Sequence, residues 1–460
     1  MIQIKCGLEV HCYLNMEHSR QKLFCGCAIQ QDAKPNSNTC PVCTAMPGSK
    51  PMAPNKEAMD KILAIALMLD CKPNHNLIFQ RKHYSWPDLP SGYQRTMSGS
   101  YAVPVGEHGT FLGIGITEVH LEEDPARWDP DTGTVDYNRS GLPLAEIVTE
   151  PEFTSPEQVK TWLKHLMTTL SYIKAVDKDA GIKADVNVSI PPAYGRVEIK
   201  NVNSFTAVVK ALEYEAERQQ QEIKQGKVIE QQTRAWNDTL GKTVFMRSKE
   251  QAMDYMFIPD PDLAIVKVDS AWLKKIEAAL PEKPQQKVQK YQKHYKLDKE
   301  HAEIIASDIN LAVLYEKVAM KVDPILAAQW LRRELLRVMH YNDVDYDQLK
   351  IDETHLIELL TMVQKKEITE TVAKKILEQL MEKPFSPQQH VEKEGLKMVA
   401  DTGQLEQFCK QAMKDNPKAV EDYKRGEENA LNFVVGSVMK MSRGKASAAE
   451  VKEILKKLLR

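Results

Sequence analysis

The sequence contains no uninterrupted apolar run of the roughly 18 residues that a membrane helix needs. Its opening segment, MIQIKCGLEVHCYL, lacks the apolar core and cleavage site of a secretory signal. Neither sign of charge dominates, because 62 Lys and Arg stand against 64 Asp and Glu, so a nucleic-acid surface has to be a local patch. We therefore expect a cytoplasmic protein that does not associate with membranes.

Cysteine is also scarce, with 8 residues in 460, which is too few for a disulfide scaffold. The hydrophobic share of 42% and the charged share of 27% are typical of a folded globular protein. At about 100 to 200 residues per domain, this length predicts roughly three domains.

The familiar nucleotide-binding signatures are missing as well. Gly241-Lys242-Thr243 resembles only the end of a P-loop, because Trp236 stands where its first glycine is required. Gly113 and Gly115 lack the third glycine of a dinucleotide fingerprint. Lys440-Met-Ser-Arg443 is similar to the signature loop of class I aminoacyl-tRNA synthetases, but no matching amino-terminal signature occurs, which argues against that class.

Strand-like and helical patterns share the first 290 residues. The strand-like runs are separated by loops rich in Pro, Gly, Asn and Asp, and no regular alternation of strand and helix occurs. This pattern favours an antiparallel-rich α+β domain. Strands are predicted at 114–121, 146–149, 186–190 and 197–199, and helices at 56–69, 156–174 and 204–224.

Beyond residue 290 the pattern is almost entirely helical, at 311–320, 327–339, 371–381, 430–441 and 446–459. We predict a first domain at 1–290, a helical domain at 291–400 and a small helical tail at 401–460. The tail holds the most basic local patch, which could also be an ordinary solvated helix face. Its cationic residues include Lys440, Arg443, Lys445, Lys452 and Lys456.

Four of the cysteines form two close pairs on a loop. One residue separates Cys25 from Cys27, two separate Cys40 from Cys43, and twelve lie between the pairs. Each pair can supply two thiolates to one tetrahedral ion, so the spacing favours structural zinc. Free thiols and an iron site remain the alternatives.

A second group combines carboxylates with a histidine. Glu9 and His11 lie on one face of an alternating strand-like run. Glu122, Glu123 and Glu146 lie at or near the ends of two further predicted strands. Oxygen ligands with one imidazole suit Mg²⁺ or Mn²⁺. Spacing alone leaves open that these are ordinary exposed acids.

With these residues in hand, the chain resembles the GatB/GatE family, the B-type subunits of tRNA-dependent amidotransferases. The resemblance runs essentially from end to end. It includes Gly7-Leu-Glu-Val-His11, Arg81-Lys-His-Tyr84 and His120-Leu-Glu-Glu-Asp124. Further similar segments are the cysteine loop, 87–94, 135–151, 198–205, 232–236 and 246–250.

The resemblance implies a cradle-shaped α+β domain, a helical domain and a tail similar to the YqeY family. It also implies ATP-dependent phosphorylation of the side-chain carboxylate of misacylated Glu-tRNA(Gln) or Asp-tRNA(Asn), followed by attack of ammonia. Magnesium ligands would be Glu9, His11, Glu122 or Glu123, and Glu146. Which of the two tRNAs is the substrate does not follow from the sequence.

Contacts to the nucleotide or to the aminoacyl end are also implied by the resemblance. At each such position, ordinary loop hydrogen bonding or a surface charge is the alternative. Two segments depart from the family. Lys183 stands where an arginine is usual, and a lysine lacks the bidentate fork of a guanidinium. The segment 254–262 lacks the arginine and the second tyrosine that are usual after Asp-Tyr. The candidates are Arg81, Lys82, Tyr84, Tyr93, Gln94, Arg139, Lys183, Lys200, Asn201 and Asn203.

The source of ammonia must lie elsewhere, because the sequence has neither an amidase-type Gly-Ser-Ser-Gly-Gly run nor an amino-terminal cysteine nucleophile. The resemblance implies a glutaminase A subunit and a small C subunit as partners in a heterotrimer, with the basic tail binding the tRNA. The rival hypothesis is a zinc-stabilised tRNA-binding subunit that has no kinase activity of its own.

Overall fold

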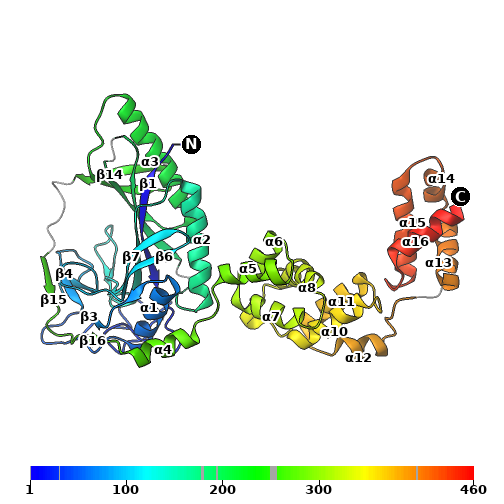
Figure 1. Cartoon of the computed structure of the whole chain (residues 1–460), viewed down its shortest axis with the longest axis horizontal. Coiled ribbons are helices and arrows are strands. Elements are labelled where there is room, and N and C mark those ends of the chain that lie inside the picture. The colour runs from blue at the N-terminus through cyan, green and yellow to red at the C-terminus, as the bar shows by residue number, and fades with distance from the viewer. Residues whose placement is uncertain are drawn as a thin grey trace. The chain divides into compact units, whose positions relative to one another are not determined.

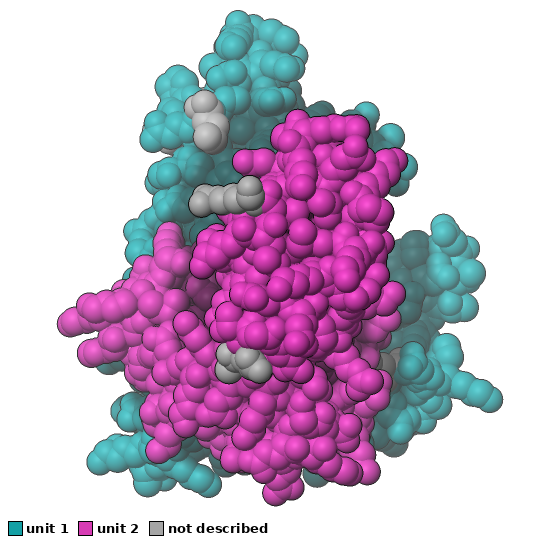
Figure 2. Space-filling model, turned by 90° about the vertical axis from the view of Figure 1, so that its right-hand side faces the viewer, with its two compact units in different colours: residues 1–283 teal, residues 284–460 magenta. Residues whose placement is uncertain are grey.

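The computed structural model describes residues 2–30, 32–177, 181–192, 195–248, 256–399 and 402–459. The chain divides into two compact units, residues 1–283 and 284–460, which Figure 2 colours separately. Our finer division at 290 and 400 stays a prediction, and residues 400 and 401 lie outside the described ranges. None of the described helices is long and apolar enough to cross a membrane.

Unit 1 is built on a 12-stranded sheet whose main path runs β14-β13-β12-β11-β1-β10-β7-β5-β4-β15, with β6 and β2 attached beside β7. The neighbouring strands of this sheet are antiparallel except for β12 with β13, which confirms the predicted antiparallel-rich α+β class. The strands of unit 1 are β1 Lys5–Tyr13, β2 Lys72–Pro73, β3 Asn76–Leu77, β4 Gln80–His83, β5 Tyr93–Thr96, β6 Gly106–Phe111, β7 Ile114–Glu123, β8 Arg127–Trp128, β9 Val135–Asp136, β10 Pro143–Thr149, β11 Ile182–Ser189, β12 Val197–Val202, β13 Gln232–Asn237, β14 Lys242–Ser248, β15 Met256–Pro259 and β16 Val266–Lys267.

Helices cover one face of this sheet (Figure 1). They are α1 Lys56–Met68, α2 Pro156–Tyr172 and α3 Phe205–Lys224, and α4 Ser270–Ala279 packs against α1. Asn55, Ser155 and Ser204 cap the first three, because each side chain accepts hydrogen bonds from free N–H groups of the first turn. The predicted helices at 56–69, 156–174 and 204–224 are thus confirmed to within a few residues.

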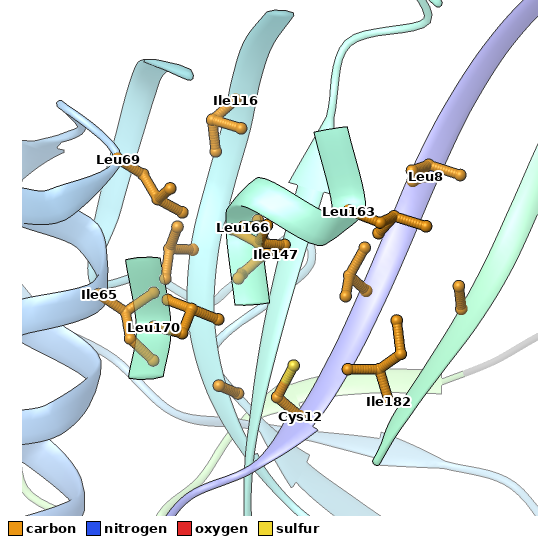
Figure 3. Packing of buried hydrophobic residues seen from close by; sticks show 14 of the residues in the cluster. Leu8, Cys12, Ile65, Leu69, Ile116, Ile147, Leu163, Leu166, Leu170 and Ile182 are labelled. Atoms are coloured by element: carbon orange, nitrogen blue, oxygen red, sulfur yellow. The ribbon is translucent and has the colours of Figure 1, made fainter. Parts of the chain in front are cut away.

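The core lies between these helices and the sheet. Figure 3 shows Leu163, Leu166 and Leu170 of α2 pointing at the strands that carry Leu8 and Ile147. Along β1 the buried residues alternate with Glu9, His11 and Tyr13, because successive side chains of a strand point to opposite faces. Because one face of β1 is buried against the helices, Glu9, His11 and Tyr13 lie on the opposite face of the strand.

Unit 2 is helical, and its described residues form two separate apolar clusters. One cluster spans residues 291–391 and the other spans 405–455, where the predicted tail lies. Its helices are α5 Pro284–His294, α6 Lys299–Ile305, α7 Ile309–Ala319, α8 Pro324–Trp330, the π-helical turn Leu331–Leu335, α9 Leu336–Tyr341, α10 Glu353–Gln364, α11 Glu370–Glu382, α12 Pro387–Lys393, α13 Thr402–Asp415, α14 Pro417–Lys424, α15 Glu428–Met441 and α16 Ala448–Leu459.

Candidate metal and nucleotide site

A cavity of about 840 Å³ lies over the charged face of the unit 1 sheet. Its floor is formed by β1, β7, β10 and β11, which adjoin one another in the order β11-β1-β10-β7. A volume of this size falls within the usual range for small-molecule sites. The cavity is therefore large enough for a nucleotide together with the end of a second substrate.

Three ligand-type side chains meet on this floor: His11, Glu122 and Glu146. Strand register brings them together, because His11 lies opposite Glu146 and Leu144 lies opposite Glu122 across the neighbouring strand pairs. His11 Nε2 is 3.4 Å from Glu146 Oε2 and 4.0 Å from Glu122 Oε1. Two carboxylates and one imidazole at this separation fit a hard divalent cation such as Mg²⁺ or Mn²⁺.

The electrostatics of this group reflect crowded negative charge. Burial and the charge of Glu146 raise the pKa of Glu122. Burial opposes ionisation of Glu146 as well, but the charges and hydrogen bonds of His120 and His11 outweigh it and hold the pKa of Glu146 well below its usual value. Burial disfavours the imidazolium of His11, yet the hydrogen bond and charge of Glu146 raise its pKa to about 8. The carboxylates thus favour a positive charge in this region, whether it is the imidazolium of His11 or a divalent cation.

His120 is buried next to Glu146 and contacts its carboxylate. Its Nε2 is 2.9 Å from Glu146 Oε2 and its Nδ1 is 3.1 Å from Glu118 Oε1. Although burial favours the neutral ring, the neighbouring carboxylates raise the pKa of His120 to about 10. His120 therefore orients Glu146, and its raised pKa favours the imidazolium, which would offset part of the negative charge of the group.

Glu123, which we predicted as a metal ligand, does not lie with this group. Adjacent residues of β7 point to opposite faces, so Glu122 enters the cavity while Glu123 turns away from it. Arg95 Nη1 is 3.2 Å from Glu123 Oε1, and the Arg95 backbone N–H donates to the same oxygen at 3.1 Å. We therefore assign Glu122 to the candidate ligand set and remove Glu123 from it.

Glu9 belongs to a second acidic group, with Asp185 of β11 and Glu198 of β12. Lys200 Nζ lies 2.5 Å from Asp185 Oδ2 and 2.9 Å from Glu198 Oε1. Burial and the charge of Glu146 raise the pKa of Glu9, against the opposing charge of Lys200. Sequence reasoning missed Asp185 and Glu198 as candidate ligands, because only the strand register shows that they meet Glu9.

The four clustered cysteines converge as the spacing predicted, with their sulfur atoms within 4.8 Å of one another. Cys43 Sγ lies 4.0 Å from Cys27 Sγ and 3.9 Å from Cys40 Sγ. A tetrahedral zinc ion with 2.3 Å bonds places its sulfur ligands roughly 3.8 Å apart. Hydrogen bonding from Cys25 lowers the pKa of Cys43 to about 4, so one thiolate is already favoured before a cation binds. The group fits structural zinc.

The predicted nucleotide contacts divide into two sets. Seven line the cavity: Lys82, Tyr84, Gln94, Arg139, Lys183, Lys200 and Asn203. Three do not. Arg81 forms ion pairs with Asp260 and Asp262, Tyr93 lines a separate cavity of about 250 Å³, and Asn201 is exposed at a positive φ of 64°. We keep only the lining residues as candidates.

Several lining residues were not singled out from the sequence. Asp88 Oδ1 is buried without a hydrogen-bond partner in the part of the chain that the structure describes. Tyr13 donates from its hydroxyl to Asp124 Oδ2 at 2.6 Å, and Arg139 Nε lies 3.1 Å from the same oxygen. The alternating pattern of β1 could have revealed Tyr13. The loop residues Asp88 and Asp124 carry no such periodic signal.

The basic residues of the tail lie near the end of α15 and on α16. Lys440, Arg443 and Lys452 are exposed, whereas Lys445 and Lys456 are partly buried. They belong to unit 2.

Comparison with known proteins gives matches over nearly the whole chain. The model of the GatB/GatE catalytic domain matches residues 4–274, and the model of the GatB domain matches residues 313–459. A Methanothermobacter thermautotrophicus protein, named as the B subunit of an aspartyl/glutamyl-tRNA(Asn/Gln) amidotransferase, is 45% identical over 98% of this chain and 99% of its own length. Proteins of the same name from Methanococcus maripaludis and Methanocaldococcus jannaschii are 44% identical (99% of this chain, 98% of theirs) and 42% identical (100% and 98%).

The cysteine group predicts a measurable zinc content. We expect about one zinc ion per chain in the purified protein and almost none in a Cys43→Ser variant, because three thiolates do not complete a closed tetrahedral site. Metal analysis by mass spectrometry measures the content. Cys71→Ser is the matched control, since Cys71 is also buried but lies outside the group. Equal zinc in both variants would contradict the assignment.

Two neighbouring substitutions test the reassignment on β7. Glu122→Gln should weaken Mn²⁺ binding at the His11 group by about tenfold or more, because one charged ligand is lost. Glu123→Gln should leave this affinity within about twofold, although loss of the Arg95 ion pair should lower stability. The Mn²⁺ affinity of both variants is measured by titration, with electron paramagnetic resonance reporting the concentration of free Mn²⁺. The reverse order of effects would restore Glu123 as the ligand.

Proposed function

The chain belongs to the GatB/GatE family, and we propose that it is the subunit in which the side-chain carboxylate of a misacylated tRNA is activated by ATP and then amidated. The observation that carries this proposal is the group formed by His11, Glu122 and Glu146, which lies in the cavity of the matched catalytic domain. The names of the relatives indicate Glu-tRNA(Gln), Asp-tRNA(Asn) or both as the substrate.

Activation is needed because a carboxylate is a poor electrophile. Direct attack of ammonia would have to expel an oxide ion. Instead, a side-chain oxygen attacks the γ-phosphorus of ATP, the bond between that phosphorus and the β,γ-bridging oxygen breaks, and ADP leaves. Ammonia then attacks the carbonyl carbon of the acyl phosphate, inorganic phosphate departs and the nitrogen loses a proton. Catalysis of the first step is mainly positioning and charge stabilisation.

The cations around the cavity suit this task. Lys82, Arg139 and Lys183 line it and can contact phosphate oxygens or the substrate carboxylate. Lys183 acts as a point charge, where a guanidinium would offer a bidentate fork. Gln94 is fixed by donation from its Nε2 to the carbonyl oxygen of Glu123 at 3.0 Å, and its amide oxygen can accept a hydrogen bond from a substrate group.

His11, Glu122 and Glu146 would hold Mg²⁺ in this site. When bound, the ion supplies charge neutralisation for the β- and γ-phosphates and aligns them for in-line transfer. The role of His120 is to keep Glu146 ionised and oriented, since it is fully buried and each of its ring nitrogens lies next to a carboxylate.

Ammonia is supplied by a glutaminase of the amidase family in this proposal, and a small C subunit completes the heterotrimer. The word subunit in the names of the relatives supports a complex with several chains. The tail would hold the tRNA by its phosphate backbone, through Lys440, Arg443, Lys445, Lys452 and Lys456.

Reconstituted amidation tests the function. The chain is expressed with A- and C-type partners and incubated with Glu-tRNA(Gln) or Asp-tRNA(Asn), glutamine, ATP and Mg²⁺. We expect amidated tRNA only with ATP and Mg²⁺, and a fall in rate of at least about a hundredfold for Glu122→Gln or His11→Ala, since several kcal/mol of metal-based stabilisation are lost.

Glu150→Gln is the matched control, because this carboxylate follows β10 but contacts Thr117 rather than the cavity. It should amidate at the wild-type rate, and glutamine hydrolysis by the partner should be retained in all variants. Tight tRNA binding without ATP turnover by the wild-type complex would instead favour the rival hypothesis, a zinc-stabilised binding subunit.

The tail generates a separate prediction. Replacing Lys440 and Lys452 by Gln should raise the Kd for tRNA. The logarithm of the association constant should also fall less steeply with the logarithm of the salt concentration, by about 0.7 to 0.9 in slope for each phosphate that is no longer neutralised. Fluorescence anisotropy at several salt concentrations measures the slope. The control replaces Lys414 and Lys418, which are exposed in the same tail but outside the basic set. Equal slopes for the two double variants would place the tRNA contacts elsewhere.

A further inference from the structure

We propose that Lys22 is a positioning residue that connects the cysteine group with the cavity. Its side chain offsets the negative charge of the zinc-loaded cysteine group and holds the segment 135–141, which carries Arg139, against the cysteine loop. Zinc binding and the order of this segment are thereby coupled. The coupling stands apart from the proposed function. Only its effect on catalysis rests on that function, in which Arg139 of the cavity wall contacts a phosphate or the substrate carboxylate.

Lys22 is buried without an acidic partner. Only 1% of this residue is exposed, and no carboxylate lies within ion-pair distance of it in the described part of the chain. Its Nζ donates to the carbonyl oxygen of Tyr137 at 2.9 Å. A buried ammonium requires a negative charge nearby, because its transfer from water is otherwise costly. A group other than a carboxylate must therefore supply that charge.

The cysteine group supplies it. A Cβ on Gly141 would lie 3.8 Å from Lys22 Cδ and 3.9 Å from Cys43 Cβ, so both side chains approach the same point of the segment. Hydrogen bonding from Cys25 is the main cause of the low pKa of Cys43, and the charge of Lys22 lowers this pKa further. Four thiolates around one divalent zinc ion leave two negative charges. Lys22 offsets part of this charge without binding the metal.

Hydrogen bonds join the cysteine loop to the segment 135–141 at further points. Asn36 Nδ2 donates to the carbonyl oxygen of Val135 at 2.9 Å, and Asn36 Oδ1 accepts from the backbone N–H of Tyr137 at 2.7 Å. Ser140 Oγ donates to the carbonyl oxygen of Cys43 at 2.8 Å. Because these partners all belong to the cysteine loop, a metal that orders this loop should also order the segment.

Arg139 extends from this segment to the cavity. Its Nε donates to the carbonyl oxygen of Pro125 at 2.9 Å, and its Nη2 donates to that of Ala126 at 2.7 Å. Asp124 Oδ2 lies 3.1 Å from the same Nε. The side chain is still 37% exposed and lines the cavity, so a ligand can reach it. A shift of the segment would displace this charge, and a displacement of about 1 Å can cost on the order of a hundredfold in rate.

Zinc affinity tests the charge role of Lys22. Lys22→Met keeps the length of the side chain but removes its charge and its donor. We expect the zinc affinity of the full-length chain to fall by about tenfold or more, because a buried anionic group loses its compensating charge. Lys22→Arg, which retains the charge, should keep more of the affinity. Competition with a chromophoric chelator measures the affinity.

Lys61→Met is the matched control. Lys61 Nζ also donates to a backbone carbonyl, that of Lys174, at 2.9 Å, and only 12% of its side chain is exposed, but its charge is paired with Glu57. Loss of this pair should leave the zinc affinity within about twofold, because the charge of Lys61 is compensated by its own partner. Either equal losses in the two variants or an unchanged affinity in Lys22→Met would overturn the charge role.

Amide hydrogen exchange tests the positioning role. Zinc removal from the wild-type chain, or Lys22→Met, should raise the exchange rates of the segment 135–141 by about tenfold or more, since local opening becomes easier. The amides of β11 in the central sheet should stay protected. Either unchanged exchange of the segment or an equal rise throughout unit 1 would overturn the positioning role, because the second result indicates general destabilisation.

The reconstituted complex tests the effect on catalysis. At saturating zinc, Lys22→Met should lower kcat/KM for amidation by about tenfold or more. In the Arg139→Gln background the same change should have little further effect, because Lys22 acts through Arg139. Additive losses would overturn this route. A wild-type complex that does not amidate would contradict the proposed function, while weaker zinc binding and faster exchange in Lys22→Met would still support the coupling.

Circular dichroism identifies a variant that fails to fold. Lys22→Gln, which has a shorter polar side chain, then takes the place of Lys22→Met with the same expected results. Zinc removal from the wild-type chain tests the coupling between the cysteine group and the segment 135–141 without any substitution.

Discussion

The two-residue period of the central strands determines where each charge of the site lies. In β1, β10 and β11 the inward side chains, such as Val10, Ala145 and Val186, are fully buried against the helices. A slip of one residue in any of these strands would bury the charged series and expose the apolar one. The hydrophobic core on one face therefore fixes the register, and the register fixes the ligand geometry on the other face.

This arrangement concentrates buried acids at a cost in stability. Glu122, Glu146 and Asp185 are largely shielded from water, and their neighbours His11, His120 and Lys200 only partly offset the repulsion. Such a group stabilises the fold only when cations complete it, because uncompensated buried charge is unfavourable. Cation binding and folding stability should thus be linked in unit 1.

Sequence reasoning succeeded where the signal was local. The cysteine pairs, the capped helices and the α+β class follow from spacing and periodicity within short windows. The choice between Glu122 and Glu123 did not, because it depends on how β7 pairs with its neighbours. The meeting of Glu9 with Asp185 and Glu198 was missed for the same reason, since strands far apart in the sequence supply the three ligands. Residues on loops, such as Asp88, give no period from which an orientation could be inferred.

Arg81, Arg95 and Glu123 point away from the cavity, and their ion pairs hold in place the strands whose neighbouring residues line it. Arg81 and Arg95 are partners across β4 and β5, and both donate to Asp260, whose side chain is fully buried. Arg95 also pairs with Glu123, so this network ties three strands together on the face opposite Lys82, Gln94 and Glu122. Breaking one partner of such a buried network typically costs about 3 to 5 kcal/mol. On β4, β5 and β7, one residue of an adjacent pair (Arg81, Arg95 or Glu123) therefore joins the buried ion-pair network. The other residue of the pair (Lys82, Gln94 or Glu122) lines the cavity.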